Sequence, residues 1–401
     1  MPATKRLMDT GDFTIQLAEN TPGDLIDTYA ISSGGYGTVI ITPVWIDPTN
    51  QTVADLLAAS CFTGQYLEED GDADRYTSLK GAHASGWLGD TSGQGPMRES
   101  GGPFSGTSQA ALFWTQVIAG IGGGTTDSPF PLAIGTVDNI GSLTWAYDWT
   151  VSAATARAAF DYVCPALGVE WRVNDDLTLD IRTPSNLYGS TPTVIVTPWW
   201  QGRDGGLTAV RATIKPSANV INYANRVLAN VFGGIGVSVA SPYTDPQGNS
   251  MFWKRQINPT ASTNLTDATA QANASLSSND RAASVPTITT DQSAVMADVE
   301  VGSFIYVFFP SADLHGEVVL GGQPTQLWYR GQPVWPAQLR VQAITMAIVQ
   351  GMGVYFCLPD GTIADFTRFV VWESASSTIE VGPTPVLLTT ALVPHGGVVN
   401  V

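Results

Sequence analysis

The sequence predicts a mainly β fold with inserted helices, which places the chain in the α+β class. Short runs of alternating or β-branched apolar residues recur along the chain. Gly, Pro, Asn and Asp separate these runs, as is typical of strands joined by turns. Hydrophobic residues make up 44% of the 401 residues, an ordinary value for a globular protein. A chain of this length is expected to form roughly two to four compact domains.

The chain carries few charged side chains, and most of them are acidic. Charged residues account for 13% of the sequence, and 35 Asp and Glu against 18 Lys and Arg give a net charge of −17. Low charge is typical of a surface covered by neighbouring subunits, because the cores of interfaces are depleted in charge. The acidic balance argues against tight nucleic-acid binding, which needs clustered Lys and Arg. A secreted β protein rich in Thr and Gly has a similar composition, so both classes stay open.

Strand and helix signals alternate in the first third of the chain. Alternating apolar residues predict strands at residues 13–17 and 39–41. Apolar residues at helical spacing predict helices at residues 52–59, where Thr52 is the candidate N-cap, and 107–119. The acidic segment 68–74 and the Gly-, Ser- and Pro-rich segment 86–106 are expected to be loops.

A helix followed by a hairpin gives the clearest local signal, between residues 150 and 182. Ser152 can cap a helix that runs to about Cys164, where Pro165 ends or kinks it. Two alternating runs, at residues 169–173 and 177–181, are joined by turn-forming residues and predict a β-hairpin. Such a unit cannot bury its apolar faces alone, so it is expected to pack against the rest of the chain.

Strands dominate from residue 193 onward. They are expected at residues 194–196, 207–214, 226–231, 235–239, 288 onward, 304–309, 326–329, 338–346, 354–358 and 369–372. A loop at 243–263 and a polar helix at 264–278 interrupt them. Residues 381–401 carry no charge, and their apolar run at 386–393 is expected to dock on this chain or on a neighbour.

No residue set is predicted to be catalytic, cofactor-binding or metal-binding. The three cysteines, Cys61, Cys164 and Cys357, are odd in number and form no CxxC motif, so neither disulfides nor a zinc site are indicated. Cys164 and Cys357 are interpreted as small core residues. No GxSxG motif is present, and the histidines lie beside Gly or Ala in sequence typical of loops: His83, His315 and His395. A serine hydrolase is therefore disfavoured.

Acidic residues were considered as metal ligands and as glycosidase carboxylates. Asp70, Asp72 and Asp74 alternate as in a calcium loop, but Arg75 and Gly81 stand where the EF-hand motif needs Gly and Glu. A solvated acidic loop at 68–74 is favoured, with calcium binding left open. The carboxylates with strand or turn surroundings are interpreted as exposed positions: Glu170, Asp180, Glu300 and Glu317.

Aromatic and glycine-rich clusters have a structural and a functional interpretation. The chain has twelve Trp residues, and the obvious aromatic clusters lie at 145–149, 198–200 and 328–329. Core filling is favoured for them over sugar stacking or interface anchoring. The segment 233–236 is the nearest candidate for a phosphate loop. Because no Lys follows it and strand patterns flank it, a hairpin turn is the better interpretation.

Five segments, in order, resemble the central tail-tip hub proteins of long-tailed (siphovirus-type) phages, in particular minor tail proteins of actinobacterial phages. They are GVEWRVNDDLTLDI at Gly168–Ile181, NYANRVLANVFG at Asn222–Gly233, ADVEVGSFIYVFFP at Ala297–Pro310, YRGQPVWPAQLRVQAITM at Tyr329–Met346, and DGTIADFTRFVVWES at Asp360–Ser374. The chain departs from the family pattern at Ser303, where Asp is commoner, and at Phe366, where Leu is commoner.

The resemblance implies a structural baseplate hub of the virion and not an enzyme. Two tube-type β-barrel domains are expected, at 1–149 and 216–310, with a helix-hairpin domain at 150–215 and a C-terminal β domain with an uncharged tail at 311–401. Three subunits then form a ring that continues and closes the tail tube. The ring contacts the distal tail protein, the tape measure protein and further minor tail proteins or fibres. DNA passes through its lumen, which is expected to be acidic, without specific binding.

Two other classes of function remain as alternatives: a module that binds carbohydrate on the host envelope, and, with less support, a peptidoglycan hydrolase. The first residues lack the apolar core of a signal peptide, and the apolar stretch at 110–121 is shorter than the ~20 residues of a membrane span. The protein is therefore expected to have no membrane span and to be made in the host cytoplasm.

Overall fold

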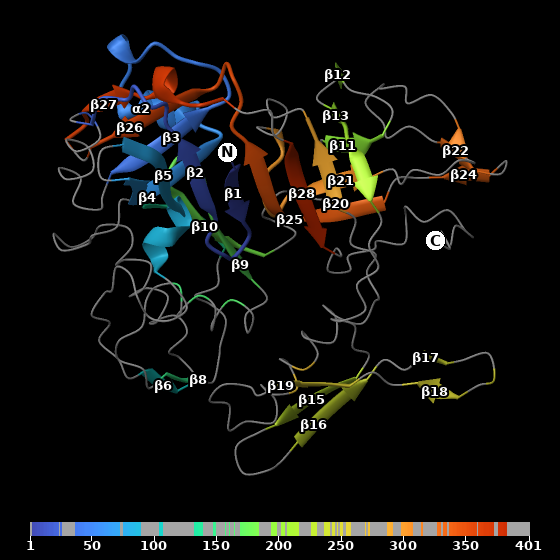
Figure 1. The fold of residues 1–401 in the computed structure, drawn as a ribbon. Helices are drawn as coiled ribbons and strands as arrows, with labels where there is room; N and C mark the ends of the chain where they lie inside the picture. The colour runs from blue at the N-terminus through green and yellow to red at the C-terminus, as the bar shows by residue number, and fades with distance from the viewer. Residues whose placement is uncertain are drawn as a thin grey trace.

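The computed structural model of the chain is built mostly from β-strands (Figure 1). The residues that it describes are 2–23, 25, 37–72, 75–89, 104–106, 132–138, 147–149, 157, 160, 164, 169–183, 194–198, 202–204, 207–215, 226–230, 236–240, 243–244, 247, 249–251, 254–257, 269, 272, 287–291, 298–307, 314–315, 327–329, 332–334, 337–358, 360–372 and 376–382. No helix within these ranges is long and apolar enough to cross a membrane.

The regular elements have the following bounds. The strands are β1 Pro2–Arg6, β2 Asp12–Gln16, β3 Thr38–Thr42, β4 Phe62–Asp72, β5 Arg75–His83, β6 Phe104–Gly106, β7 Ala133–Val137, β8 Tyr147–Trp149, β9 Glu170–Val173, β10 Thr178–Arg182, β11 Val194–Thr197, β12 Gly202–Asp204, β13 Leu207–Arg211, β14 Thr213–Lys215, β15 Arg226–Asn230, β16 Gly236–Ala240, β17 Tyr243–Thr244, β18 Ser250–Met251, β19 Lys254–Ile257, β20 Thr287–Thr290, β21 Phe304–Val307, β22 Leu314–His315, β23 Leu327–Tyr329, β24 Gln332–Val334, β25 Ala337–Ala347, β26 Gly353–Cys357, β27 Ile363–Asp365 and β28 Ser377–Gly382. The helix α2 spans Val53–Ala58, and 3-10 helices are η1 Pro48–Asn50, η2 Ala84–Leu88 and η5 Thr367–Phe369.

Fifteen strands form one large sheet. Their order is β12-β13-β11-β21-β25-β1-β2-β5-β4-β3-β26-β27, and β14, β20 and β28 branch from β25. Strand β1 therefore lies between β2 and β25, which belongs to the last quarter of the chain. The prediction of a mainly β fold with few helices is confirmed. The sheet path is open at β12 and β27, so among the described strands the expected barrels are not seen as closed sheets.

The main sheet combines strands from all four predicted ranges, 1–149, 150–215, 216–310 and 311–401. The proposed division into four domains stays a prediction. Five smaller sheets complete the described strands: β7-β10-β9, β16-β15-β19, β17-β18, β22-β23-β24 and β6-β8. Strands β15, β16 and β19 lie apart from the main sheet (Figure 1).

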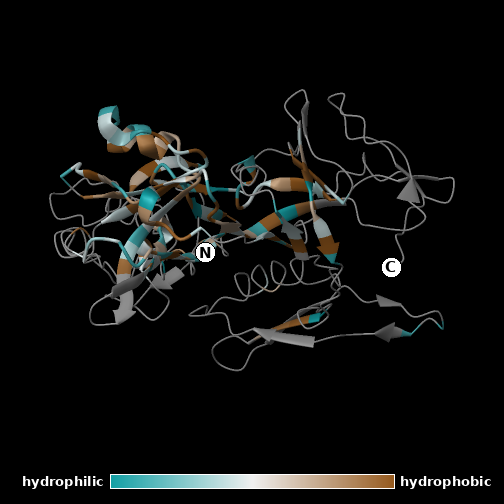
Figure 2. Ribbon diagram, turned by 45° about the horizontal axis from the view of Figure 1, so that its top comes forward, coloured by the Kyte–Doolittle hydropathy of each residue, from teal (hydrophilic) through white to brown (hydrophobic). Residues whose placement is uncertain are grey.

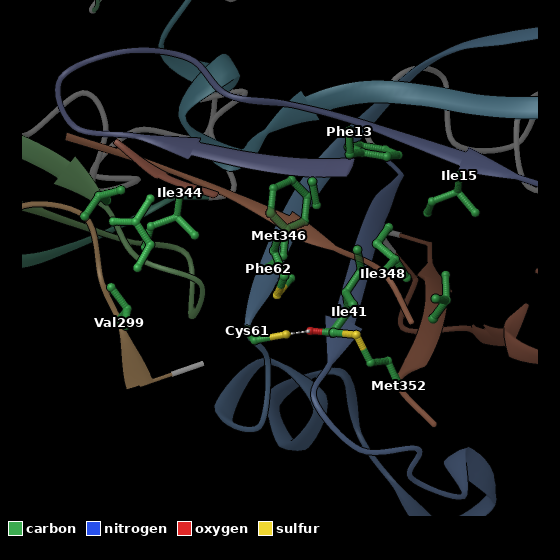
Figure 3. Close-up of a cluster of buried hydrophobic side chains, with 14 of the residues drawn as sticks. Phe13, Ile15, Ile41, Cys61, Phe62, Val299, Ile344, Met346, Ile348 and Met352 are labelled. Atoms are coloured by element: carbon green, nitrogen blue, oxygen red, sulfur yellow. Dashed lines mark hydrogen bonds between the residues drawn. The ribbon is translucent and has the colours of Figure 1, made fainter. Parts of the chain in front are cut away.

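Alternating side chains of the strands build the core, which Figure 3 shows around Phe13. Phe13 and Ile15 point to the same face of β2, since side chains two apart share a face. Phe13 meets Phe62 edge to face at a centroid distance of 5.8 Å, and Met346 of β25 lies in the same cluster. Apolar residues concentrate on the strands of this sheet (Figure 2).

Two glycines make room for the ring of Phe13. A Cβ atom on Gly81 would lie 2.1 Å from the backbone oxygen of Gln65 and 2.4 Å from Cε1 of Phe13. A Cβ atom on Gly64 would lie 2.8 Å from the same ring atom. The requirement for glycine at position 81, which breaks the calcium-loop motif, is therefore explained by packing.

Most predicted elements of the described residues are confirmed. Helix α2 begins at the predicted cap, where Thr52 and Asp55 form a capping box. Positions 157, 160 and 164 are helical, and β9 and β10 pair as the predicted antiparallel hairpin. The segment 226–240 is also a hairpin, as predicted. The predicted helix at 107–119 and the tail at 386–393 lie outside the described residues.

Several predictions were wrong. The acidic segment 68–74 is not a loop up to Asp72, because β4 continues through it. The register with β5 places Glu68 opposite Lys80 and Asp72 opposite Arg75. The predicted surface excursion at 86–106 begins with η2, in which Trp87 and Leu88 are fully buried.

The remaining errors concern loops and strands whose partners are distant in sequence. The loop predicted at 243–263 contains β19, which pairs in parallel with β15. The strand predicted at 369–372 is reduced to a single bridge at Val370, because the 3-10 helix η5 ends only at Phe369. Oδ1 of Asp365 accepts the backbone N–H of Thr367 at 2.9 Å at the start of this helix. Strand β1 was not predicted at all, and five-residue pairing with β25 forms it.

Candidate functional site

The turn of the predicted hairpin is held against the main sheet by hydrogen bonds. Nζ of Lys5, on β1, donates to Oδ2 of Asp175 at 2.8 Å and to the backbone oxygen of Cys61 at 2.9 Å. The backbone oxygen of Asp175 accepts from the hydroxyls of Thr63 at 2.6 Å and Ser60 at 3.2 Å. The turn between β9 and β10 is therefore fixed both by its charge and by its backbone.

His83 lies on the other side of the same carboxylate. Its Nε2 is 3.6 Å from Oδ1 of Asp175, and its Nδ1 accepts the backbone N–H of Ser85 at 3.3 Å, which caps η2. Because Nδ1 is the acceptor, the neutral ring carries its proton on Nε2, which faces Asp175. The sequence placed His83 in a loop, which was wrong: it ends β5 and is 1% exposed.

Burial and charge together set the pKa values of this group. Burial alone would raise the pKa of Asp175, but the charge of Lys5 and the hydrogen bonds and charges of His83 and Lys5 together outweigh it and hold that pKa far below its usual range. Burial would lower the pKa of Lys5, but the charge and hydrogen bond of Asp175, together with smaller contributions from Cys61 and Glu300, outweigh this and raise it. Burial lowers the pKa of His83. At neutral pH the group is an ion pair beside a neutral imidazole.

Ser85, His83 and Asp175 are the residue types of a hydrolase triad, and the structure does bring them together. Oγ of Ser85 lies 3.0 Å from Nδ1 of His83 and donates to the backbone oxygen of Asp9 at 3.2 Å. A nucleophile must reach its substrate, whereas Ser85 and His83 are each 1% exposed. The geometry therefore suits a buried structural network and not nucleophilic catalysis.

A second group of charges joins β9 to strand β25 and to the turn before β21. The guanidinium of Arg340, 0% exposed, binds both carboxylate oxygens of Glu170, with Nη1 to Oε1 at 2.7 Å, and its Nε donates to the backbone oxygen of Gly302 at 3.0 Å. Arg172 binds Glu300 at 2.7 Å and Asp180 at 3.2 Å. Two arginines thus connect the hairpin to segments more than a hundred residues away.

These contacts account for three carboxylates that were considered for glycosidase chemistry. Burial raises the pKa of Glu170 although Arg340 opposes this, and the carboxylate is bound bidentately. Burial would raise the pKa of Asp180, but hydrogen bonds from Asn174 and from the backbone of Thr136 lower it. A general acid needs a proton to donate, and these carboxylates instead accept hydrogen bonds. The fourth candidate, Glu317, lies outside the described residues.

The helix of the helix-hairpin unit is attached in the same manner. The guanidinium of Arg157 stacks over the ring of Trp171 at 5.1 Å and donates to Oδ1 of Asp9 at 3.0 Å. Phe160 packs on Trp171 with ring centroids 6.0 Å apart, and both rings are fully buried. Trp171 therefore fills the core between helix and hairpin.

We call the ionic contacts at the hairpin the charged seam; all of its members are buried or partly buried except Glu300, whose side chain is 53% exposed. The members are Lys5, His83, Glu170, Arg172, Asp175, Asp180, Glu300 and Arg340. Removing one partner of a buried pair typically costs about 3–5 kcal/mol, because the other charge is left without compensation. The charged seam therefore holds the helix-hairpin unit on the main sheet in one orientation.

Lys5 and Arg340 were not predicted as partners of the hairpin, and Asp175 was predicted only as a turn residue. The sequence did contain one indication, the acidic turn Asn174, Asp175 and Asp176. Because the helix-hairpin unit must pack against the rest of the chain, its acidic turn favours cations on the surface that it contacts. No pattern in the sequence indicates which cations these are, because each lies 170 residues from its carboxylate partner.

The other candidate residues do not form a site within the described part of the chain. No group of three or more His, Cys, Asp or Glu that can hold a metal occurs there. Cys61, Cys164 and Cys357 are buried thiols, as predicted for Cys164 and Cys357, and burial raises the pKa of Cys61 and Cys357 to about 12. His395, Asp74 and the Trp residues at 199–200 lie outside the described residues.

Comparisons with known proteins give distant structural likenesses only. No family model and no curated protein matches the sequence. Similar solved structures are the 43 kDa tail protein of prophage MuSo2 from Shewanella oneidensis (11% identity, 96% of this chain and 93% of that chain, TM-score 0.48), a tail protein from Neisseria meningitidis MC58 (12%, 95% and 96%, 0.45) and prophage tail protein gp18 from Listeria monocytogenes EGD-e (10%, 96% and 88%, 0.46). Likenesses with such low identity and TM-scores carry no argument about this chain's function.

Proposed function

We propose that the chain is a structural subunit of a phage tail tip, the hub whose three copies form a ring that continues and closes the tail tube. One observation carries the proposal. Three of the segments that resemble hub proteins meet in the charged seam: Gly168–Ile181 supplies the hairpin, Ala297–Pro310 supplies Glu300, and Tyr329–Met346 supplies Arg340. Segments that resemble the family in order along the sequence thus also lie together in space.

The chemistry of the seam supports assembly rather than catalysis. Ser85 is buried, and Glu170, Asp180 and Glu300 are bound to arginines, so the residue types that catalysis needs are used to hold structure. Strands β12 and β27 end the described path of the main sheet, and neighbouring subunits can complete such edges. We assign tube-type domains to 1–149 and 216–310, with 150–215 and 311–401 outside the ring.

The proposed partners follow from the same resemblance. The ring contacts the distal tail protein on one side and further minor tail proteins or fibres on the other, and it encloses the end of the tape measure protein. The net charge of −17 supports an acidic lumen, since like charge keeps DNA from adhering to the wall as it passes. A lumen lined by basic or apolar residues contradicts this part of the proposal.

Mass photometry of the purified chain, followed by electron cryomicroscopy of the assembled particle, tests the proposal. We expect a particle of three subunits with cyclic symmetry and a central passage. If the trimer is obligate, each subunit buries more than roughly 2,000 Å². A compact monomer without a passage at micromolar concentration, or one that cleaves peptidoglycan in a zymogram, refutes the proposal.

A further inference from the structure

A short segment after β3 is held rigidly although its side chains face solvent. Val44 is 66% exposed and Trp45 is 48% exposed, which is unusual for apolar residues of this size. Free apolar side chains on a loop usually move and fold back onto the protein. Here the backbone and the indole ring are both fixed by hydrogen bonds.

Five hydrogen bonds fix the segment. The hydroxyl of Tyr355 accepts the backbone N–H of Ile46 at 2.6 Å and donates to the carbonyl of the same residue at 2.7 Å. The backbone N–H of Trp45 donates to the oxygen of Gly351 at 2.8 Å, and its indole Nε1 donates to Oδ2 of Asp365 at 3.0 Å. The hydroxyl of Thr42 donates to the oxygen of Val44 at 2.7 Å.

The surroundings of Trp45 combine a sheet edge with negative charge. Asp365 ends β27, the last strand of the main sheet, and no described strand pairs with its outer side. Strands β3, β26 and β27 and helix α2 lie together at this end of the sheet (Figure 1). Residues 38–60 contain Asp47 and Asp55 and no Lys or Arg.

The facing segment, residues 351–372, adds Asp360, Asp365 and the single cation Arg368. Hydrogen bonds from the side chain and backbone of Thr49 lower the pKa of Asp47, and hydrogen bonds from Thr362 lower that of Asp360, so both carboxylates stay charged well below neutral pH. The guanidinium of Arg368 lies over the ring of Phe369 at 4.7 Å. The net charge of this end of the sheet is therefore negative.

We propose that Trp45, Val44 and the outer edge of β27 form a docking surface for an extended, positively charged segment of another protein. The added strand pairs with β27, its Lys or Arg side chains lie near Asp47, Asp360 and Asp365, and one of them stacks on the ring of Trp45. A fixed indole ring loses little conformational entropy on binding, which makes it an effective anchor. Another copy of this acidic chain lacks the charge complementarity. The inference does not depend on the ring proposed above.

Fluorescence anisotropy with the full-length chain tests the surface. The probe is a fluorescein-labelled synthetic peptide that alternates Lys and Val, and the matched probe alternates Glu and Val. We expect only the Lys peptide to bind, and we expect half-molar salt to weaken its binding. The variant W45A should bind the Lys peptide at least roughly tenfold more weakly, because truncated Trp anchors have effects of this size. W45F keeps a ring without the indole donor and should lose less.

The matched control is L67S, since Leu67 is another exposed apolar residue, at 58%. It should bind the Lys peptide as the unchanged chain does, and circular dichroism should show W45A folded. Absent binding, equal binding of the Glu peptide, or an unaffected W45A overturns the proposal. Two further results for W45A also overturn the proposal. If W45A no longer self-associates, the surface binds a second copy of the chain. If W45A no longer binds a soluble peptidoglycan digest but still binds the Lys peptide, the surface binds a glycan.

Discussion

Replacing Asp175 by Asn tests the charged seam at the contact that holds the hairpin turn. Asparagine keeps the shape of the side chain, and the backbone oxygen still accepts from Thr63 and Ser60. What is removed is the charge that compensates Lys5, whose side chain is 9% exposed. The free energy of unfolding should fall by about 3–5 kcal/mol, the range for breaking a buried pair from one side.

Urea unfolding followed by circular dichroism measures this effect, and for cooperative unfolding of a chain of this length the midpoint of thermal unfolding should fall by roughly 4–6 °C. The neighbouring residue offers a matched control. Arg6 and Glu380 form an exposed pair 3.9 Å apart, so E380Q should change stability by less than about 1 kcal/mol. The double variant K5M/D175N removes both charges and should recover most of the loss.

Two results refute this reasoning. If D175N is as stable as E380Q, Lys5 is solvated or finds another partner, and the seam does not depend on charge. If K5M/D175N is less stable than D175N, the stabilisation comes from hydrogen bonds of the lysine to the sheet, such as the one to Cys61, and not from the ion pair.

The other predictions concern the pH dependence, the core and the helix cap. Burial lowers the pKa of His83 in the folded state, so its contribution to stability is complete above the unfolded pKa of about 6.5 and is lost as pH falls through the lower folded pKa. The variant H83Q should therefore show a flatter dependence of stability on pH below about pH 6.5, measured by urea titrations at several pH values. G81A should lower the free energy of unfolding by about 1–3 kcal/mol or more, since the added Cβ meets Phe13 and the backbone of Gln65. The control is A58G, in an exposed helical position, which should lower it by no more than about 1 kcal/mol. T52A should lower stability by about 1 kcal/mol through loss of the cap of α2, and T52S should retain it; equal stability of all three proteins contradicts the capping box.

The sequence predicts elements whose cause is local. Thr52 caps a helix because its hydroxyl reaches a backbone N–H three residues on, and Asn174 to Asp176 form a turn because short polar side chains bind nearby backbone. Strand β1 and the acidic half of β4 have no such local cause. They are strands because β25 and β5 offer them partners, and pairing over long sequence distances is not visible in one sequence.

The seam was missed for a related reason. Chemistry was sought where Asp, Glu and His cluster along the sequence, whereas the buried contacts join single residues from distant elements: Lys5 with Asp175, and Arg340 with Glu170. A buried carboxylate next to a histidine is also what a catalytic site looks like. A structural network and a catalytic site differ here only in exposure, and Ser85 is buried in η2, which directly follows β5.

The placement of the cations links the seam to the docking surface. Lys5, Arg157, Arg172 and Arg340 are all buried, and each is bound to a carboxylate. Since carboxylates are buried together with these cations, the exterior keeps the acidic balance of a chain with 18 Lys and Arg against 35 Asp and Glu. Salt should therefore separate the two sites, because screening weakens exposed charges far more than buried ones. Half-molar salt should weaken the Lys peptide at Trp45 while the difference in stability between D175N and the unchanged chain persists.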